Sequence, residues 1–195
     1  MLTFLFAGCA RQIEVVKLYD ETGDSSRQFE KFFVVSIAGD SLTRRRLEDM
    51  ITSQLQAAGG SAISAHTRTG VKTTLLQEEI NTAAEAAGAD AILITHVVSV
   101  ATTANMEEGR VNVTAECRGG DPADYFLYDY EELKEPDSVS IAHTVVVVTN
   151  LYAAREGKLL WTIRSTCFEK ETMDEVLLQE AEAIARQLKI DKLIS

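Results

Sequence analysis

The chain has 195 residues, of which 46% are hydrophobic and 25% are charged, and its formal net charge is −11. This composition is typical of one globular domain with a core large enough to fold alone. An acidic surface repels phosphate backbones, which argues against nucleic acid as a partner, and no apolar run reaches the roughly 18 to 20 residues of a membrane-spanning helix.

The chain opens with a short apolar stretch that ends in two small residues and a cysteine, Ala7-Gly8-Cys9. Signal peptides end in small residues, and this ending resembles the bacterial lipobox, in which the cysteine is acylated and becomes the first residue of the mature protein. We therefore predict that residues 1–8 are the end of an export signal and that Cys9 is lipidated. Phe6 stands where leucine is usual. The basic n-region is missing and the apolar run is short, and both are expected if the true start lies upstream. The alternative is a frayed N-terminus or a first strand of a cytosolic protein.

Residues 10–28 are mostly polar, with a brief apolar patch at Ile13, Val15 and Val16. The run Gly23-Asp24-Ser25-Ser26 is typical of a loop. We predict that residues 9–28 form a lipid-anchored tether, with room for one short edge strand, and that residues 29–195 form a single domain.

The domain begins with a strand, a helix and a second strand. Residues 32–38 form a continuous apolar run typical of a buried strand, and Gly39-Asp40-Ser41 ends it. Apolar residues then recur at helical spacing until Gly59-Gly60 stops the helix, and residues 61–67 are predicted as a short strand. The residues expected on the buried side of this helix are Leu47, Met50, Ile51, Leu55 and Ala58.

A second helix is predicted from a capping box at residues 74–77 to a glycine, Gly88, and a buried strand follows at 91–100. Its inner stripe is expected to hold Leu76, Ile80, Ala83, Ala84 and Ala87. Residues 111–115 alternate as a strand does. Two long strands, 140–154 and 158–169, are joined by a tight turn at Arg155-Glu156-Gly157, and a capping box at Thr172 opens the last helix.

This order predicts a single α/β (α+β) domain, in which three helices pack on a mixed sheet of about five strands with a long C-terminal β-hairpin. The expected order is β-α-β-α-β-β-β-α. An acidic, tyrosine-rich insert lies at about 116–138.

Two stretches resemble a known group of proteins. Gly88-Ala89-Asp90-Ala91 is similar to the step into the third strand of the N-terminal domain of the Tol translocation protein and of the curli secretion lipoprotein. The stretch from Thr149 to Ser165, with Gly157 in the turn and Trp161 beyond it, resembles a hairpin of small, functionally uncharacterised bacterial lipoproteins. The resemblance covers most of residues 32–193 and implies an exported lipoprotein, which favours lipidation of Cys9.

No catalytic or metal-binding constellation stands out. The three histidines, His66, His96 and His143, lack the carboxylate or cysteine partners that a metal site needs, and no nucleophile motif is present. We therefore predict no cofactor, no metal and no catalytic residue. The alternative is a small cytosolic enzyme or ligand-binding domain whose site uses the strand-end loops near Gly39, Arg44, His66 and His96.

The acidic insert is the main candidate for a contact with a partner. Aromatic residues on a polar loop often mark a binding surface, and here they are Tyr125, Phe126, Tyr128 and Tyr130. Alternatively, Phe126 and Tyr130 cover the sheet. In an oxidising compartment, Cys117 and Cys167 would form a disulfide.

The sequence thus favours a non-enzymatic cell-envelope lipoprotein that acts as a scaffold or protein-interaction module. Its expected partners are a membrane, through the lipid anchor, and an envelope protein or further copies of itself. Ala10 follows the cysteine in place of aspartate, which by resemblance to enterobacterial sorting favours an outer-membrane lipoprotein facing the periplasm.

Overall fold

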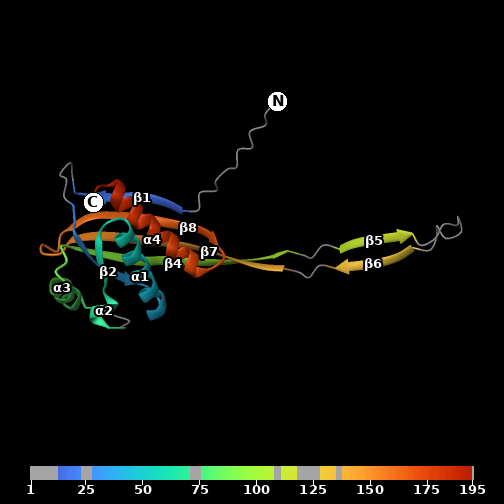
Figure 1. Ribbon diagram of the computed structural model, residues 1–195, viewed down its shortest axis with the longest axis horizontal. Helices are drawn as coiled ribbons and strands as arrows, with labels where there is room; N and C mark the ends of the chain where they lie inside the picture. The colour runs from blue at the N-terminus through green and yellow to red at the C-terminus, as the bar shows by residue number, and fades with distance from the viewer. Residues whose placement is uncertain are drawn as a thin grey trace, which may run out of the picture.

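A computed structural model gives the structure of residues 13–22, 28–70, 76–107, 111–117, 128–134 and 138–194, with the backbone alone for 107, 111–117, 128–134 and 138. The elements in chain order are β1 (Ile13–Asp20), β2 (Lys31–Ile37), α1 (Ser41–Ala57), β3 (Ser61–Ser64), α2 (His66–Thr69), α3 (Gln77–Ala86), β4 (Ala91–Glu107), β5 (Val111–Cys117), β6 (Tyr128–Lys134), β7 (Ser138–Ala153), β8 (Leu159–Lys170) and α4 (Met173–Ile190). Figure 1 shows their arrangement.

The main sheet has six strands in the order β1-β8-β7-β4-β2-β3. β2 runs parallel to β3 and β4, whereas β4, β7, β8 and β1 are joined by antiparallel pairings. β5 and β6 form a separate two-stranded sheet beyond the main one (Figure 1). The mixed α/β fold predicted from the sequence is confirmed.

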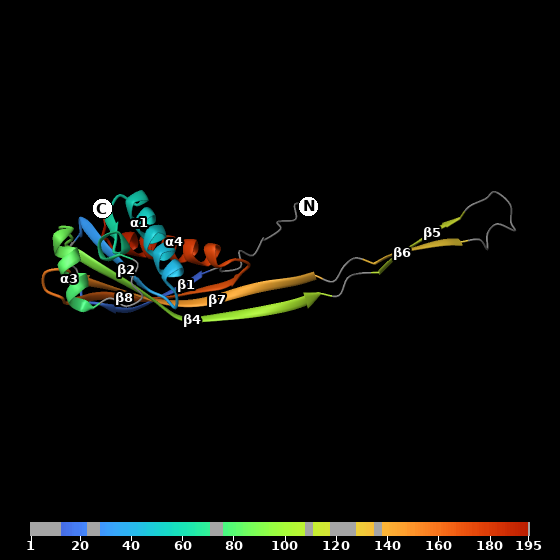
Figure 2. The same cartoon turned by 90° about the horizontal axis from the view of Figure 1, so that it is seen from below.

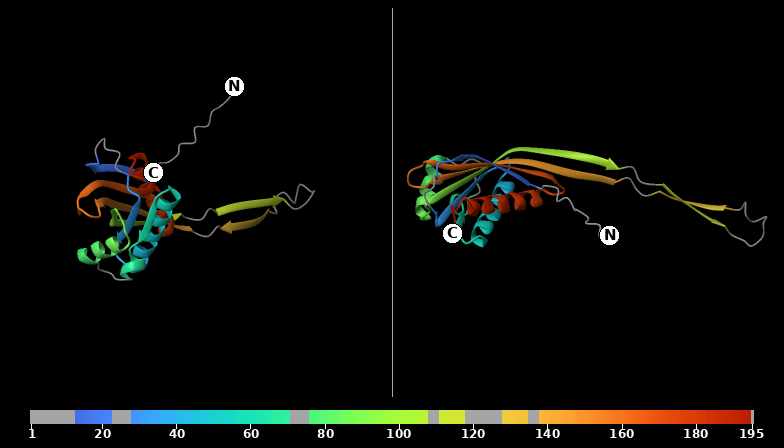
Figure 3. Two further views of the ribbon diagram at one scale, coloured as in Figure 1. Left: turned by 60° about the vertical axis from the view of Figure 1, so that its left-hand side comes forward. Right: turned by 90° about the horizontal axis from the view of Figure 1, so that it is seen from above.

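Helices α1 and α4 pack side by side on one face of the sheet (Figure 3). Both helices have the expected spacing of apolar residues, and the side chains of Leu47, Ile51 and Leu55 on α1 are fully buried. Asp40 caps α1 by accepting the N–H groups of Leu42 and Thr43 at 2.9 and 2.8 Å. From α4, Leu177, Ala181, Ile184 and Leu188 join the same core, which also contains Trp161.

Helix α3 covers only one end of the opposite face. It packs Ala84 and Ala87 against Phe33, Val35 and Ile92 of the sheet. The predicted glycine cap at the end of α3 is present, because Gly88 has a φ of 65°, a left-handed conformation that favours glycine.

Two local predictions were wrong. The second strand is shorter than predicted, because its pairing with β2 ends at Ser64 opposite Val34 and residues 66–69 turn into α2. The second helix begins at Gln77, and Leu76 is exposed instead of lying on the inner stripe. The Glu79 carboxylate accepts the N–H of Leu76, the observed N-cap, at 3.3 Å, and Thr74, the predicted cap, lies outside the described residues.

Strand β1 lies inside the segment predicted as a tether. It is an edge strand paired with β8 from Ile13 opposite Cys167 to Asp20 opposite Trp161. The sheet therefore begins four residues after Cys9.

Strands β4 and β7 are longer than predicted and form a two-stranded ribbon. They pair from Ala91 opposite Ala153 to Glu107 opposite Ser138. β2 pairs with β4 only as far as His96, and β8 pairs with β7 only as far as His143. Beyond these positions the ribbon extends past the helices (Figure 2).

Candidate functional site

The alternative enzyme site was predicted near Gly39, Arg44, His66 and His96. Two of these, Arg44 and His66, are brought together by the buried carboxylate of Glu48. Glu48 on α1 has no exposed surface. One of its oxygens accepts the Ser36 N–H at 3.1 Å and the Arg44 Nε at 2.9 Å. The other oxygen lies 2.9 Å from His66 Nδ1 and accepts the His66 N–H at 2.8 Å.

This Glu48 cluster ties β2, α1 and α2 together. Both carboxylate oxygens are occupied by protein groups, and Arg44 is itself buried, so the carboxylate offers no open position to a substrate. The remaining nitrogen of His66, Nε2, faces Asp49 Oδ1 at 3.4 Å. The arrangement is that of a structural ion-pair network.

Gly39 and His96 do not join the cluster. Gly39 is exposed between β2 and the cap of α1, and His96 is exposed on β4 opposite Ile37. Within the described part of the chain, no group of three or more histidines, cysteines or carboxylates could hold a metal ion.

A second buried carboxylate lies on α4. Glu180 is fully buried, and one oxygen accepts the Ser165 hydroxyl, whereas Oε1 has no hydrogen-bond partner among the described residues. Burial raises the pKa of Glu180 to about 7, against the smaller lowering effect of the Ser165 bond. Helical spacing carries a signal for this position, because Glu180 is three residues after Leu177 and four before Ile184, which are both buried on α4.

Cys167 lies close to this carboxylate in the core. Its thiol is 3.5 Å from Gln179 Oε1, and burial raises its pKa to about 11, with a further contribution from Glu180. A thiol held protonated in this way is a poor nucleophile, which fits a core residue better than a reactive one.

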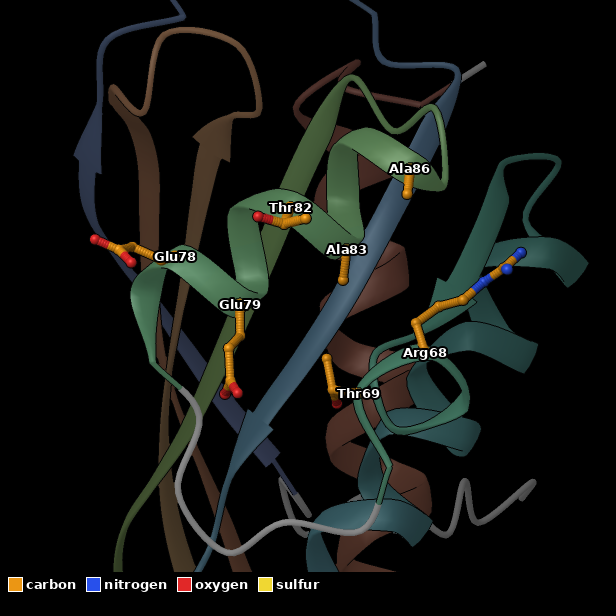
Figure 4. A pocket seen from close by; sticks show the side chains of 7 residues that line it. All are labelled: Arg68, Thr69, Glu78, Glu79, Thr82, Ala83 and Ala86. Atoms are coloured by element: carbon orange, nitrogen blue, oxygen red, sulfur yellow. The ribbon is translucent and has the colours of Figure 1, made fainter.

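Two cavities lie beside α3, and neither includes the Glu48 cluster. The first, of about 560 Å³, is an open space between α2 and α3. Its charged side chains, Arg68, Glu78 and Glu79, do not converge on one point: Arg68 points away from α3, and Glu78 points away from α2 (Figure 4). The second, of about 350 Å³, is lined by Ile92, Ile94 and Tyr152, and none of its described lining residues is charged. Neither cavity therefore resembles a catalytic centre.

The remaining predicted site residues fall largely outside what the structure describes. Cys9, Tyr125 and Phe126 lie outside the described residues. Tyr128 and Tyr130 lie on β6, and Cys117 lies on β5 opposite Tyr128, with only their backbones described. The partner-contact surface and the Cys117–Cys167 disulfide therefore stay predictions.

The ribbon carries an apolar face that the sequence pattern did not predict. Its cross-strand pairs alternate between a face continuous with the helix-covered core and the opposite face. On the core side, Met106 is 76% exposed, Val139 59%, Val100 50% and Ile141 48%. The apolar ribbon face, as we call it, consists of Val100, Ala104, Met106, Val139 and Ile141.

The other side of the ribbon is polar or small. It presents Ala101, Thr103 and Asn105 from β4 opposite Thr144, Ala142 and Ser140 from β7. The ribbon is therefore amphipathic, and exposed apolar surface of this kind commonly marks a contact with a partner or a membrane. Among the described helices, none is long and apolar enough to cross a bilayer.

No family model and no curated protein matches the chain. Similar solved structures include a PelC dodecamer from Paraburkholderia phytofirmans, at 12% identity over 94% of this chain and 99% of that one, with a TM-score of 0.48. Lipoprotein GNA1162 from Neisseria meningitidis is 16% identical over 83% of this chain and 99% of that one, with a TM-score of 0.41. TM-scores below 0.5 do not establish a shared fold, so these similarities indicate nothing about the function of this chain.

Proposed function

We propose that the protein is a non-enzymatic lipoprotein of the cell envelope, anchored through Cys9, whose α/β domain is a scaffold or interaction module. The observation that carries the anchor is the ending Ala7-Gly8-Cys9 directly before a strand of the sheet, which begins at Ile13. An acyl chain on Cys9 would hold the folded domain close to a bilayer, and two or more chains would make the attachment stable.

Two observations support the interaction role: the candidate catalytic positions are occupied by protein groups, and an apolar surface is exposed. The Glu48 cluster is saturated by protein groups, and the described cavities gather no reactive side chains. The apolar ribbon face, in contrast, is open. The acidic insert adds a second candidate surface, and Ala10 after the cysteine favours the outer membrane, facing the periplasm.

Metabolic labelling with palmitate tests the anchor in a bacterial host that carries the lipoprotein pathway. The chain is expressed with its natural upstream sequence, beside a Cys9→Ala variant and a control variant, Cys167→Ala, that keeps Cys9. We expect label on the parent and on Cys167→Ala and none on Cys9→Ala, with the labelled protein in the outer-membrane fraction. Label that persists in Cys9→Ala, or no label on any chain, would refute the anchor.

A further inference from the structure

The apolar ribbon face and Ile13, the first residue of β1, lie at the same end of the sheet. Ile13 lies opposite Cys167. Cys167 in turn lies opposite Val145, the fully buried residue of β7 nearest the ribbon. β1 and β7 are both antiparallel to β8, so they run in the same direction. The N-terminal end of β1 therefore faces the side toward which the ribbon extends.

Chain length places the anchor within reach of the ribbon. Cys9 is four residues before Ile13, so it lies within about 14 Å of it, whatever path the chain takes. Ile141 is four residues before Val145 along the same strand direction, about 13 Å away. An acyl group on Cys9 can therefore enter a bilayer at the level of the apolar ribbon face.

We propose that the apolar ribbon face rests on the surface of a lipid bilayer, beside the acyl chains carried by Cys9. This inference deepens the proposed function and rests on it. Met106 and its cross-strand partner Val139, together with Ile141, would sit among the lipid headgroups and the upper acyl chains. The polar side of the ribbon, with Thr103 and Asn105, would face water.

The charge distribution supports a bilayer as the occupant. Residues 97–106 and 138–144 contain no Asp, Glu, Lys or Arg, although 25% of the chain is charged. The polar pair Thr102 and His143 shares the apolar side, and its two side chains are joined by a hydrogen bond of 3.1 Å. These residues can therefore approach a bilayer without removing acidic or basic groups of these types from water. The first acidic residue of the ribbon, Glu107, lies at its far end, opposite Ser138.

The net charge of the chain indicates which kind of surface the apolar ribbon face would contact. A charge of −11 disfavours the close stacking of two copies and the approach to an anionic surface. A zwitterionic lipid surface is therefore the favoured partner.

An introduced tryptophan can report contact with lipid, because the single natural tryptophan, Trp161, is fully buried. The reporter is Met106→Trp on the apolar ribbon face, and the matched control is its neighbour Asn105→Trp on the polar side. Val139→Trp and Ser140→Trp form a second pair on β7, in case the first pair disturbs the ribbon. Each lipidated chain is reconstituted into phosphatidylcholine vesicles with brominated acyl chains, which quench tryptophan only at short range.

We expect a blue shift and a loss of fluorescence for Met106→Trp and Val139→Trp, with little change for Asn105→Trp and Ser140→Trp. Equal quenching of both members of each pair, or none in any lipidated variant, would overturn the proposal while leaving the anchor intact. A blue shift without quenching that grows with protein concentration would assign the face to a second copy and would also overturn it.

Adding Cys9→Ala to the two reporter variants separates the inference from the proposed function. The same vesicles are mixed with these unlipidated chains at increasing lipid concentration. Selective quenching of Met106→Trp here would support the bilayer contact even if palmitate labelling had refuted the anchor. No quenching at any lipid concentration, together with none in the lipidated chain, would refute the contact alone.

Discussion

Glu180 is a carboxyl group that the fold holds in its protonated form at mildly acidic pH. Its pKa is about 7 in the folded chain, compared with an ordinary value of 4.5. Between these values the folded state binds a proton that the unfolded state does not, so the stability contributed by this group falls as pH rises from 4.5 to 7. Over this window the loss amounts to about 3 kcal/mol of unfolding free energy.

Glu180→Gln should remove this dependence, because the amide cannot ionise. Relative to the parent, the variant should gain stability as pH rises through the window, by up to about 3 kcal/mol at pH 8 compared with pH 4.5. Urea unfolding of both chains at several pH values measures the difference. Glu182→Gln, at an exposed position on the same helix, is the matched control and should follow the parent at every pH. A Glu180→Gln curve parallel to that of the parent would contradict the prediction.

The Glu48 cluster shows which part of the site could not be predicted from the sequence. Arg44 and Glu48 are one helical turn apart, a spacing that predicts an ordinary surface pair. Their burial depends on the short helix α2, which begins where β3 stops pairing and brings the His66 N–H to the carboxylate. The sequence predicted the residues near this point but not the acid that joins them, because the joining bonds depend on a turn that no motif marks.

The Asp191 side chain, at the C-terminal cap of α4, bonds to strand β1. The Asp191 carboxylate accepts bonds from Lys17 Nζ and Trp161 Nε1, both at 2.7 Å, and from Gln187 at 3.1 Å. The bond to Asp191 is the largest of the causes that raise the pKa of Lys17. Asp191 therefore couples the edge strand, the central hairpin and the last helix.

Asp191→Ala should loosen β1 before it unfolds the domain. It leaves the buried Trp161 N–H without its acceptor and Lys17 without one of its two carboxylates, at a cost of about 1–3 kcal/mol. Hydrogen exchange measured by mass spectrometry should show faster exchange in residues 13–20 and little change in β7. Asp174→Ala, which removes an exposed pair with Arg46, is the control and should leave β1 protected. Uniform acceleration of exchange across the sheet would contradict a local role.

At the scale of elements, the sequence predicted best where local signals and burial agree. Thr172 caps α4 as expected, and the apolar spacing of α1 and α4 matches their buried residues. The start of β7 was predicted to within two residues, whereas the last seven residues of β4 were not predicted as strand, because residues such as Ala101 and Thr103 fit a loop as well as a strand. The extent of β1 was hidden for a related reason, since edge-strand pairing leaves only a weak apolar pattern.

At the scale of the whole molecule, the six-stranded sheet and the β5–β6 sheet are separate pairing units. Among the described residues, β5 pairs with β6 in register from Val111 to Cys117, and the two sheets share no strand. Glu107 and Ser138, which flank residues 108–137 and thus nearly all of the acidic insert, are cross-strand partners, so the ribbon holds the two flanking positions together.

Replacing residues 108–137 with Asn-Gly should close the ribbon without weakening the domain. A two-residue Asn-Gly turn matches the twist of a hairpin and joins directly paired positions such as Glu107 and Ser138. We expect the unfolding free energy to change by less than about 1 kcal/mol, which corresponds to less than about 4 °C in Tm for a chain of this size. Thermal unfolding followed by circular dichroism measures this change.

The control is a chain in which residues 108–137 are replaced with a glycine-serine linker as long as the segment removed. It tests the contribution of the tight turn, and it should be no more stable than the Asn-Gly chain. A much larger loss of Tm in both chains would show that the insert is part of the cooperative core, and it would then have to be treated as one structural unit with the sheet.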